Sequence, residues 1–206
     1  IGDSYILPVP TREKYHFAGW YNGNVQVGSE GSWSYDSDLT LTAKWQPKEY
    51  KIVYKLNEGE VNNENNPTVY TVETSLDKLV LLDPIKEFSA FLGWYVDEAL
   101  TQKITSIDPN AYEGITLYPK WETIKVTLNY DANGGNASKE QEILNLGDNY
   151  LLPVPVRAGY KFEGWLLNNE IFSNSGKLTD RDLTVINLVA KWTIEEYNIT
   201  YLGGGE

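Results

Sequence analysis

A short pattern, Phe-x-Gly-Trp, occurs three times along the chain and constrains its fold more than any other feature. The Trp residues of this pattern lie 74 and 71 residues apart, at Trp20, Trp94 and Trp165. A second pattern, Lys-Trp, comes after each of them and ends at Trp45, Trp121 and Trp192. A period of this length is typical of a tandem array of one small unit, so we expect repeated units instead of one large core.

The two ends of the chain cut through this period. Residues 2–10 repeat residues 147–155 almost one for one, but no residues before them match the strand–turn–strand pattern expected at 125–146. At the other end, residues 197–201 repeat residues 50–54. We therefore expect an N-terminally truncated unit, two full units and the start of a fourth, at 1–46, 50–121, 124–192 and 197–206. The chain contains no Met, even at its first position, so we interpret it as a piece of a longer protein.

Alternation of apolar and polar residues predicts β-strands in every unit. Leu39, Leu41, Ala43 and Trp45 alternate with polar residues, and the same alternation recurs at 115–121. A period of two is typical of a strand that buries one face and exposes the other.

Turn signals divide these strands. Residues 125–130 are rich in β-formers and lead into Asp-Ala-Asn-Gly-Gly at 131–135, whose glycines are expected to supply the positive φ of a tight hairpin. The returning strand is expected at 137–146. Prolines at positions 8, 10, 153 and 155 exclude a helix there and predict extended connections. Helical turns are expected only at 77–82 and 108–112, so the sequence predicts a mainly β fold with little helix.

Charge and composition exclude several classes of partner and chemistry. The net charge of −12 argues against nucleic acid and anionic membranes as partners, because both select a basic surface. No run approaches the roughly 18 apolar residues that a membrane span needs, so we expect no direct membrane insertion. The chain has no Cys, and His16 is its only His, so thiolate sites and a typical zinc site cannot form. The segment 131–134 lacks the spaced acidic ligands of a calcium loop. We therefore expect a non-enzymatic protein with no catalytic residue, no cofactor and no metal.

Three motifs recur together at this spacing. They are an aromatic residue followed by Gly-Trp in a core strand, the hairpin sequence Asn-Gly-Gly at 133–135, and a closing strand such as Thr-Leu-Thr-Ala-Lys-Trp at 40–45. In combination they resemble the Listeria–Bacteroides repeat, the type of the B repeat of internalin-like bacterial surface proteins. The second unit departs from the pattern, with Leu-Asn-Glu-Gly at 56–59. The resemblance implies a tandem array of small ubiquitin-like, β-grasp-like units, α+β in class but with little helix.

The aromatic residues are candidates for both core and surface roles. We expect the six repeated Trp residues in the cores, because a unit of about 70 residues depends on large aromatics for its apolar burial. Trp33 aligns with Leu178 and is also expected to fill a core. Tyr21 and Tyr95 each come directly after an inward Trp and so should face outward, and Tyr118 should share the outer face of its strand. These three Tyr residues are the candidate ligand contacts.

The resemblance also implies a location and a role. We expect a repeat region of a bacterial surface protein, extracellular on the cell wall or secreted, that acts as an elongated spacer or in adhesion. The alternative is a ligand-binding adhesin module that contacts host glycans or host-surface proteins through exposed aromatics. The truncated first unit and residues 197–206 further predict end-to-end self-association, in which the last segment of one chain pairs with a free sheet edge of another.

Overall fold

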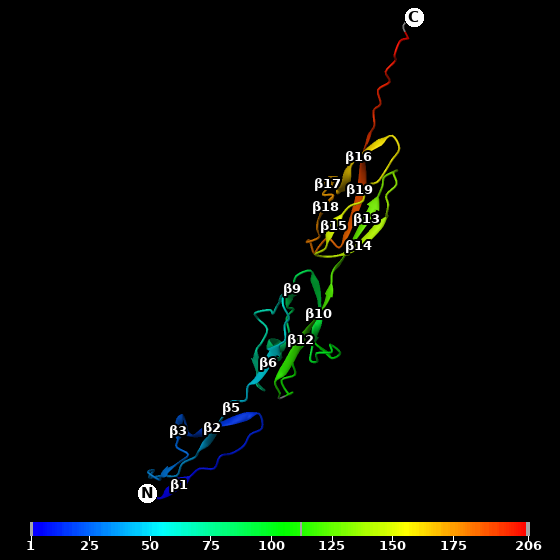
Figure 1. The fold of residues 1–206 in the computed structure, drawn as a ribbon. Coiled ribbons are helices and arrows are strands. Elements are labelled where there is room, and N and C mark those ends of the chain that lie inside the picture. Colours follow the sequence, from blue (N-terminus) through cyan, green and yellow to red (C-terminus); the bar gives the residue numbers. More distant parts are fainter. Residues whose placement is uncertain (1, 112, 205–206) are drawn as a thin grey trace. The chain divides into compact units, whose positions relative to one another are not determined.

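The computed structural model of the chain describes residues 2–111 and 113–204 and is mainly β (Figure 1). The described strands form three larger sheets and three two-stranded sheets. By their internal contacts the residues divide into two units, Ile1–Ile85 with Phe91–Lys120 and Lys86–Ala90 with Trp121–Glu206. Each of the three larger sheets contains one Phe-x-Gly-Trp segment, so the sequence period is also a structural period.

The first repeat forms an antiparallel three-stranded sheet in the order β3-β2-β5, with a separate antiparallel pair, β1 and β4. The strands are β1 Ser4–Ile6, β2 Tyr15–Asn22, β3 Val25–Val27, β4 Glu30–Ser32 and β5 Thr42–Pro47. Prolines 8 and 10 lie between β1 and β2 in a segment without strand pairing, as expected from their fixed φ and missing N–H. Among the described residues, no strand pairs with the outer edge of β5.

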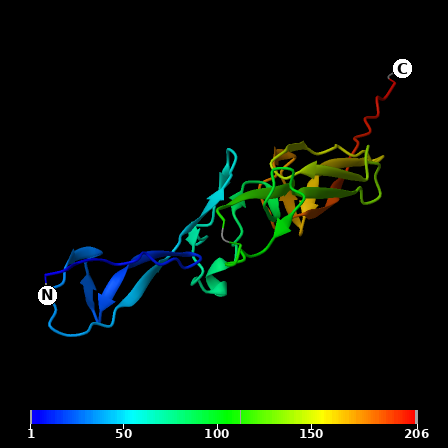
Figure 2. The same ribbon diagram turned by 90° about the horizontal axis from the view of Figure 1, so that it is seen from below.

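The second repeat forms a five-stranded sheet in the order β11-β10-β12-β6-β8, in which β6 runs parallel to β12. A two-stranded sheet, β7-β9, accompanies it. The elements are β6 Tyr50–Tyr54, β7 Glu60–Val61, β8 Val69–Tyr70, η1 Leu76–Leu79, β9 Ile85–Lys86, β10 Ser89–Tyr95, β11 Lys103–Ile104 and β12 Ile115–Thr123. The 3-10 turn η1 (Figure 2) stands where a helical turn was expected at 77–82. Residues 108–111 form no helix, and Tyr112 lies outside the described residues.

The third repeat forms a five-stranded sheet in the order β14-β13-β19-β16-β17, in which β13 runs parallel to β19 and the other neighbours are antiparallel. The pair β15-β18 forms a second small sheet. The strands are β13 Lys125–Asp131, β14 Gln141–Asn145, β15 Asn149–Leu151, β16 Tyr160–Leu167, β17 Glu170–Phe172, β18 Ser175–Lys177 and β19 Val185–Ile194. Prolines 153 and 155 again lie in an unpaired connection.

The Trp of each Phe-x-Gly-Trp segment makes the same hydrogen bond in all three repeats. Its indole N–H donates to the backbone carbonyl of the residue twelve positions earlier, at 2.7–3.0 Å. Trp94 and Trp165 are 2% and 0% exposed and lie in the two hydrophobic cores. Each also packs against a Tyr from the parallel strand, Tyr54 or Tyr130. The prediction of a core position is therefore confirmed for these two Trp residues.

The other four repeated Trp residues are only half-buried, so the prediction was too strong for them. Trp20 has no described partner strand corresponding to β6 or β13 to cover it. Trp45, Trp121 and Trp192 stand near the ends of their closing strands, and Trp192 still packs against the core of the third repeat.

Trp33 occupies the place that the alignment with Leu178 predicted. The backbone N–H of Trp33 donates to the backbone carbonyl of Asp3, as the backbone N–H of Leu178 donates to that of Asp148. The Trp33 ring lies half-buried against Tyr5, in an edge-to-face contact with the ring centroids 6.2 Å apart. The alignment of the first repeat with the third therefore holds at the backbone level.

The Gly of the Phe-x-Gly-Trp motif is required by a β-bulge. Gly19, Gly93 and Gly164 have φ values of 132°, 138° and 142°, a region that residues with a Cβ rarely adopt. In the first and third repeats the pairing register shifts at this point, so that one residue of the strand has no partner opposite it. The motif therefore encodes an extra residue in the strand, which re-aims the next residue, the Trp, toward the core.

The hairpin predicted from Asp-Ala-Asn-Gly-Gly differs from the expectation. A tight turn does form, because the N–H of Gly135 donates to the carbonyl of Ala132 at 2.9 Å and Asn133 and Gly134 both have positive φ. The returning strand begins only at Gln141, however, so the connection is a long loop. Gly135 has no positive φ. It leaves room for Trp192, because a Cβ there would lie 2.5 Å from the indole ring.

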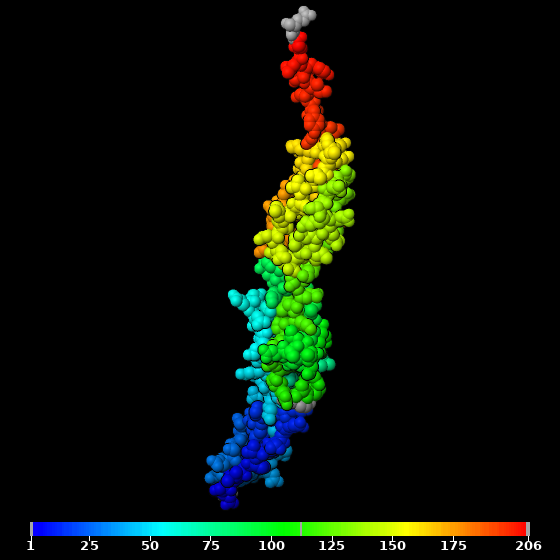
Figure 3. Space-filling model, turned by 45° about the vertical axis from the view of Figure 1, so that its right-hand side comes forward, coloured from blue at the N-terminus to red at the C-terminus, as the bar shows by residue number. Residues whose placement is uncertain are grey.

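The segment after β19 forms no strand over its described residues, to position 204 (Figure 1). Figure 3 shows the atoms of this segment in red. Tyr197, Ile199 and Tyr201 are all at least 75% exposed. These are the residues that repeat the opening strand of a unit. The association of this segment with a second chain stays a prediction.

Candidate functional site

Two of the three candidate Tyr residues are covered by lysine side chains from the neighbouring closing strand. The Lys44 Nζ lies 4.1 Å from the centroid of the Tyr21 ring, and the Lys120 Nζ lies 5.1 Å from that of Tyr95. Such cation–π contacts stabilise by about 0.5–1 kcal/mol where solvent is near. Tyr21 is half-buried, whereas Tyr95 is only 9% exposed.

The expected outward exposure is therefore wrong for Tyr95. Alternation correctly predicted that the Tyr95 side chain points to the face opposite Trp94. On that face, however, the Lys120 side chain lies over the Tyr95 ring. Sequence alternation says which face a residue points to and says nothing about what lies over that face.

Tyr118 lies in a different setting. It is half-buried on β12 and lines an open hollow of about 420 Å³ in the second repeat. The other lining residues are Lys55, Leu56, Asn57, Glu98, Leu100 and Pro119. We refer to this set, together with Tyr118, as the Tyr118 hollow. It combines one aromatic ring, a few aliphatic side chains and groups that can donate or accept hydrogen bonds.

The Tyr118 hollow is bordered by a loop whose conformation Asp97 organises. The Asp97 carboxylate accepts hydrogen bonds from the Thr101 N–H at 3.0 Å, the Thr101 hydroxyl at 2.9 Å and the Gln102 N–H at 2.7 Å. Desolvation alone would raise the pKa of Asp97, but these hydrogen bonds to its charged form outweigh it and lower the pKa below its usual value. The loop also holds Leu100 at a φ of 56°, which is uncommon for a residue with a branched side chain.

This loop is specific to the second repeat. From Trp94 to Ile104, which faces it across β10 and β11, the chain advances ten positions. The corresponding pairs, Trp20 with Val27 and Trp165 with Phe172, are seven positions apart. Sequence reasoning missed the hollow, although the longer spacing after Trp94 was a readable signal of an insertion.

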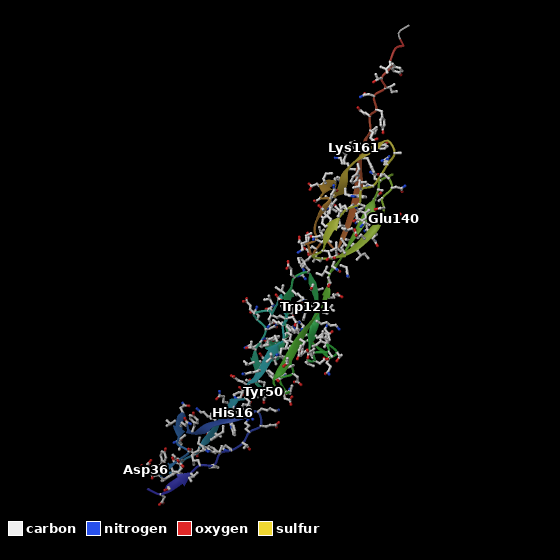
Figure 4. The ribbon with its side chains drawn as sticks, viewed as in Figure 1. His16, Asp36, Tyr50, Trp121, Glu140 and Lys161 are labelled. Carbon is white, nitrogen blue, oxygen red and sulfur yellow. The ribbon has the colours of Figure 1, made fainter. Side chains whose placement is uncertain are left out.

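The remaining candidate chemistry is sparse. Among residues 2–111 and 113–204, no three His, Cys, Asp or Glu side chains gather as a metal site would require. His16 lies on an exposed position of β2 (Figure 4). No helix in the described part of the chain has the length and apolar character to cross a bilayer.

The recurring sheets define a tandem-repeat protein of small β units. Each sheet has a Gly of positive φ before the motif Trp and the same indole-to-carbonyl hydrogen bond. The sequence profile of the Listeria-Bacteroides repeat domain matches residues 2–44, 50–120 and 127–191. The chain belongs to this family.

Two curated relatives come from the bacterium Evansella cellulosilytica. A "Putative Gly-rich membrane protein" is 29% identical over 203 residues, which is 94% of this chain and 22% of the relative. A "Putative membrane protein" is 33% identical over 174 residues, 81% of this chain and 24% of the relative. The chain thus spans less than a quarter of the length of both relatives. No solved structure matches it.

Proposed function

We propose that the chain is a non-enzymatic repeat region of a bacterial surface protein, in which each repeat acts as a spacer. The observation that carries this proposal is the parallel pairing of the first and last main strands of a repeat. In the third repeat, β13 runs parallel to β19, with Thr127 opposite Val185 and Asp131 opposite Val189. In the second repeat, β6 runs parallel to β12 in the same way.

Parallel first and last strands place the entry and the exit of the chain at opposite ends of a repeat. The chain enters the third repeat at the start of β13 and leaves it at the end of β19, which is 10 residues long. At about 3.3 Å per residue, β19 alone spans about 33 Å. The third repeat therefore holds the chain segments on its two sides apart by roughly this length, and the parallel β6 and β12 give the second repeat the same arrangement. Antiparallel first and last strands would return the chain to the end at which it entered.

Short connections between the repeats support the same role. Two residues join β5 to β6, and one residue joins β12 to β13. Neither connection is a flexible Gly/Ser tether, so little length is left free to vary. The net charge of −12 favours solubility of a dense array through mutual repulsion.

Location and fold type are inferred from the comparisons and the strand order. Both relatives carry names of membrane proteins, and we infer a position outside the cell, at the bacterial surface or secreted. Counting only the strands of the larger sheet, the order in the third repeat is second-first-fifth-third-fourth. This order supports a β-grasp-like fold in which the β15-β18 pair stands where other members of that class carry a helix.

Distances between introduced spin labels test the spacer role, because the chain has no Cys and labels can be placed at will. One double variant, E122C with E195C, spans the third repeat, and another, E49C with E195C, spans the second and third. A spacer gives a narrow distribution for the first pair near 35 Å, as roughly estimated from strand length. It gives a mean about twice as long for the second pair. The pair V185C with E195C, along β19 itself, calibrates the scale.

Equal mean distances for the two spanning pairs would overturn the spacer proposal. So would a broad distribution for the longer pair, because a spacer must hold its length. The mean and the width of the distance distributions are measured without any ligand, so they test the spacer role separately from binding.

A further inference from the structure

We propose that the Tyr118 hollow of the second repeat is a binding site for a neutral saccharide, presented by this one repeat and absent from the others. This inference does not depend on the spacer role, because it concerns the surface of a single repeat. Three observations carry it, namely the composition of the hollow, the loop that builds it, and the contrast with the corresponding places in the other repeats.

The composition of the hollow suits a sugar ring. A pyranose presents a face of C–H groups and a rim of hydroxyls, so it needs an apolar platform surrounded by hydrogen-bonding groups. Tyr118 and Leu100, both half-buried, supply the platform. Lys55, Asn57 and Glu98 supply an ammonium, an amide and a carboxylate, which together can donate to and accept from hydroxyls.

Charge and size narrow the class of ligand further. The lining carries one positive and one negative side chain, Lys55 and Glu98, so it has no net charge to favour an anion or a cation. Among the described residues, neither of these two side chains forms an ion pair within the chain. A volume of about 420 Å³ falls in the range of small-molecule sites. The hollow is open, and polar or charged side chains are among its lining residues, which favours a hydrated ligand over an apolar one.

The loop that borders the hollow is held in one conformation before any ligand arrives. The three hydrogen bonds to the Asp97 carboxylate fix residues 97–102, and Leu100 is kept at positive φ beside the hollow. An uncommon backbone conformation persists only where surrounding contacts determine it, and such positions gather at ligand sites. A preformed loop also lowers the entropy that binding has to overcome.

The corresponding places in the other repeats lack these features. From the shared Trp positions, Tyr118 corresponds to Thr42 in the first repeat and to Val189 in the third. Tyr54 and Tyr130 both pack on the motif Trp, so Lys55 corresponds to Asp131. The loop insertion is absent from both other repeats. The hollow is therefore not a by-product of the repeat fold.

The test uses the whole chain and monitors backbone amide NMR signals during titration with methyl glycosides of common neutral and N-acetylated hexoses. We expect at least one glycoside to shift amide signals of the residues that line the hollow, in a saturable manner. Y118A should weaken that binding about tenfold, since loss of one aromatic contact corresponds to about 1.4 kcal/mol. Y118F keeps the ring and should retain most of the affinity.

Matched variants separate recognition from folding. V189A alters the corresponding position of the third repeat and should leave binding unchanged. K55D introduces the residue of the third repeat and should weaken binding without disturbing the amide spectrum elsewhere. The proposal is overturned if no glycoside shifts these signals at its solubility limit. It is equally overturned if the shifts are scattered over all repeats, or if Y118A and V189A behave alike.

Discussion

Replacing Gly164 by Ala tests the claim that the bulge explains the Phe-x-Gly-Trp motif. Gly164 is buried and has a φ of 142°, where a side chain is strained in any surroundings. Backbone conformations of this kind cost about 1–3 kcal/mol for a residue with a Cβ. The added methyl group would also lie 3.2 Å from the Ile171 Cδ1, a tight contact that a small side-chain shift can relieve.

We therefore expect G164A to lower the free energy of unfolding of the third repeat by about 2–3 kcal/mol. A unit of about 70 residues has a total stability of about 4–10 kcal/mol, so the loss is a large part of it. Urea titration monitored by the NMR signals of the Leu128 and Leu188 amides reads this repeat alone, because both residues lie in its core. Fluorescence would mix all seven Trp residues of the chain.

Two further variants separate the causes of the loss. G159K places a Lys at a φ of 75° with no atom within 4 Å, and the first repeat already carries Lys14 there at 68°. It should cost about 1 kcal/mol, the low end of the range for a residue with a Cβ in the left-handed region. In the double variant G164A with I171A, the penalty of the Gly164 change should persist if backbone conformation is its cause. A loss below about 0.5 kcal/mol for G164A, within the range of ordinary surface substitutions, would refute the reasoning.

Two other predictions concern the hairpin and the second core. G135A should lower the stability of the third repeat by about 1–3 kcal/mol and shift the Trp192 indole N–H signal, because its Cβ would meet the ring at 2.5 Å. An unchanged indole signal would contradict that contact. Burial raises the pKa of Tyr54 to about 12 from 10.0. Its contribution to stability is therefore complete below pH 10 and is lost as the pH rises from 10 through 12. Alkaline unfolding of the second repeat should be less steep in Y54F, and an identical pH profile would argue against the shift.

Much of the architecture could be predicted from the sequence because its signals are local. The period of the Gly-Trp segments, the alternation in β5 and β12, and the prolines at 8, 10, 153 and 155 all act within a few residues. Strand formation and the exclusion of helix depend on backbone sterics and on side-chain alternation. Both are set by residues that are neighbours in the sequence. The mainly β class and the number of repeated segments could be derived from these signals alone.

The candidate site depended on residues that meet only after folding. Tyr95 is buried because Lys120, from a strand 25 positions later, lies over its ring. Position 135 requires a Gly because Trp192, 57 positions away, occupies the space that a side chain would need.

The Tyr118 hollow likewise unites residues from three separate segments, around positions 55, 98 and 118. Sequence periodicity specifies which way a side chain points from its own strand. The groups that it meets there are decided by strand order and register, and these are properties of the tertiary structure alone.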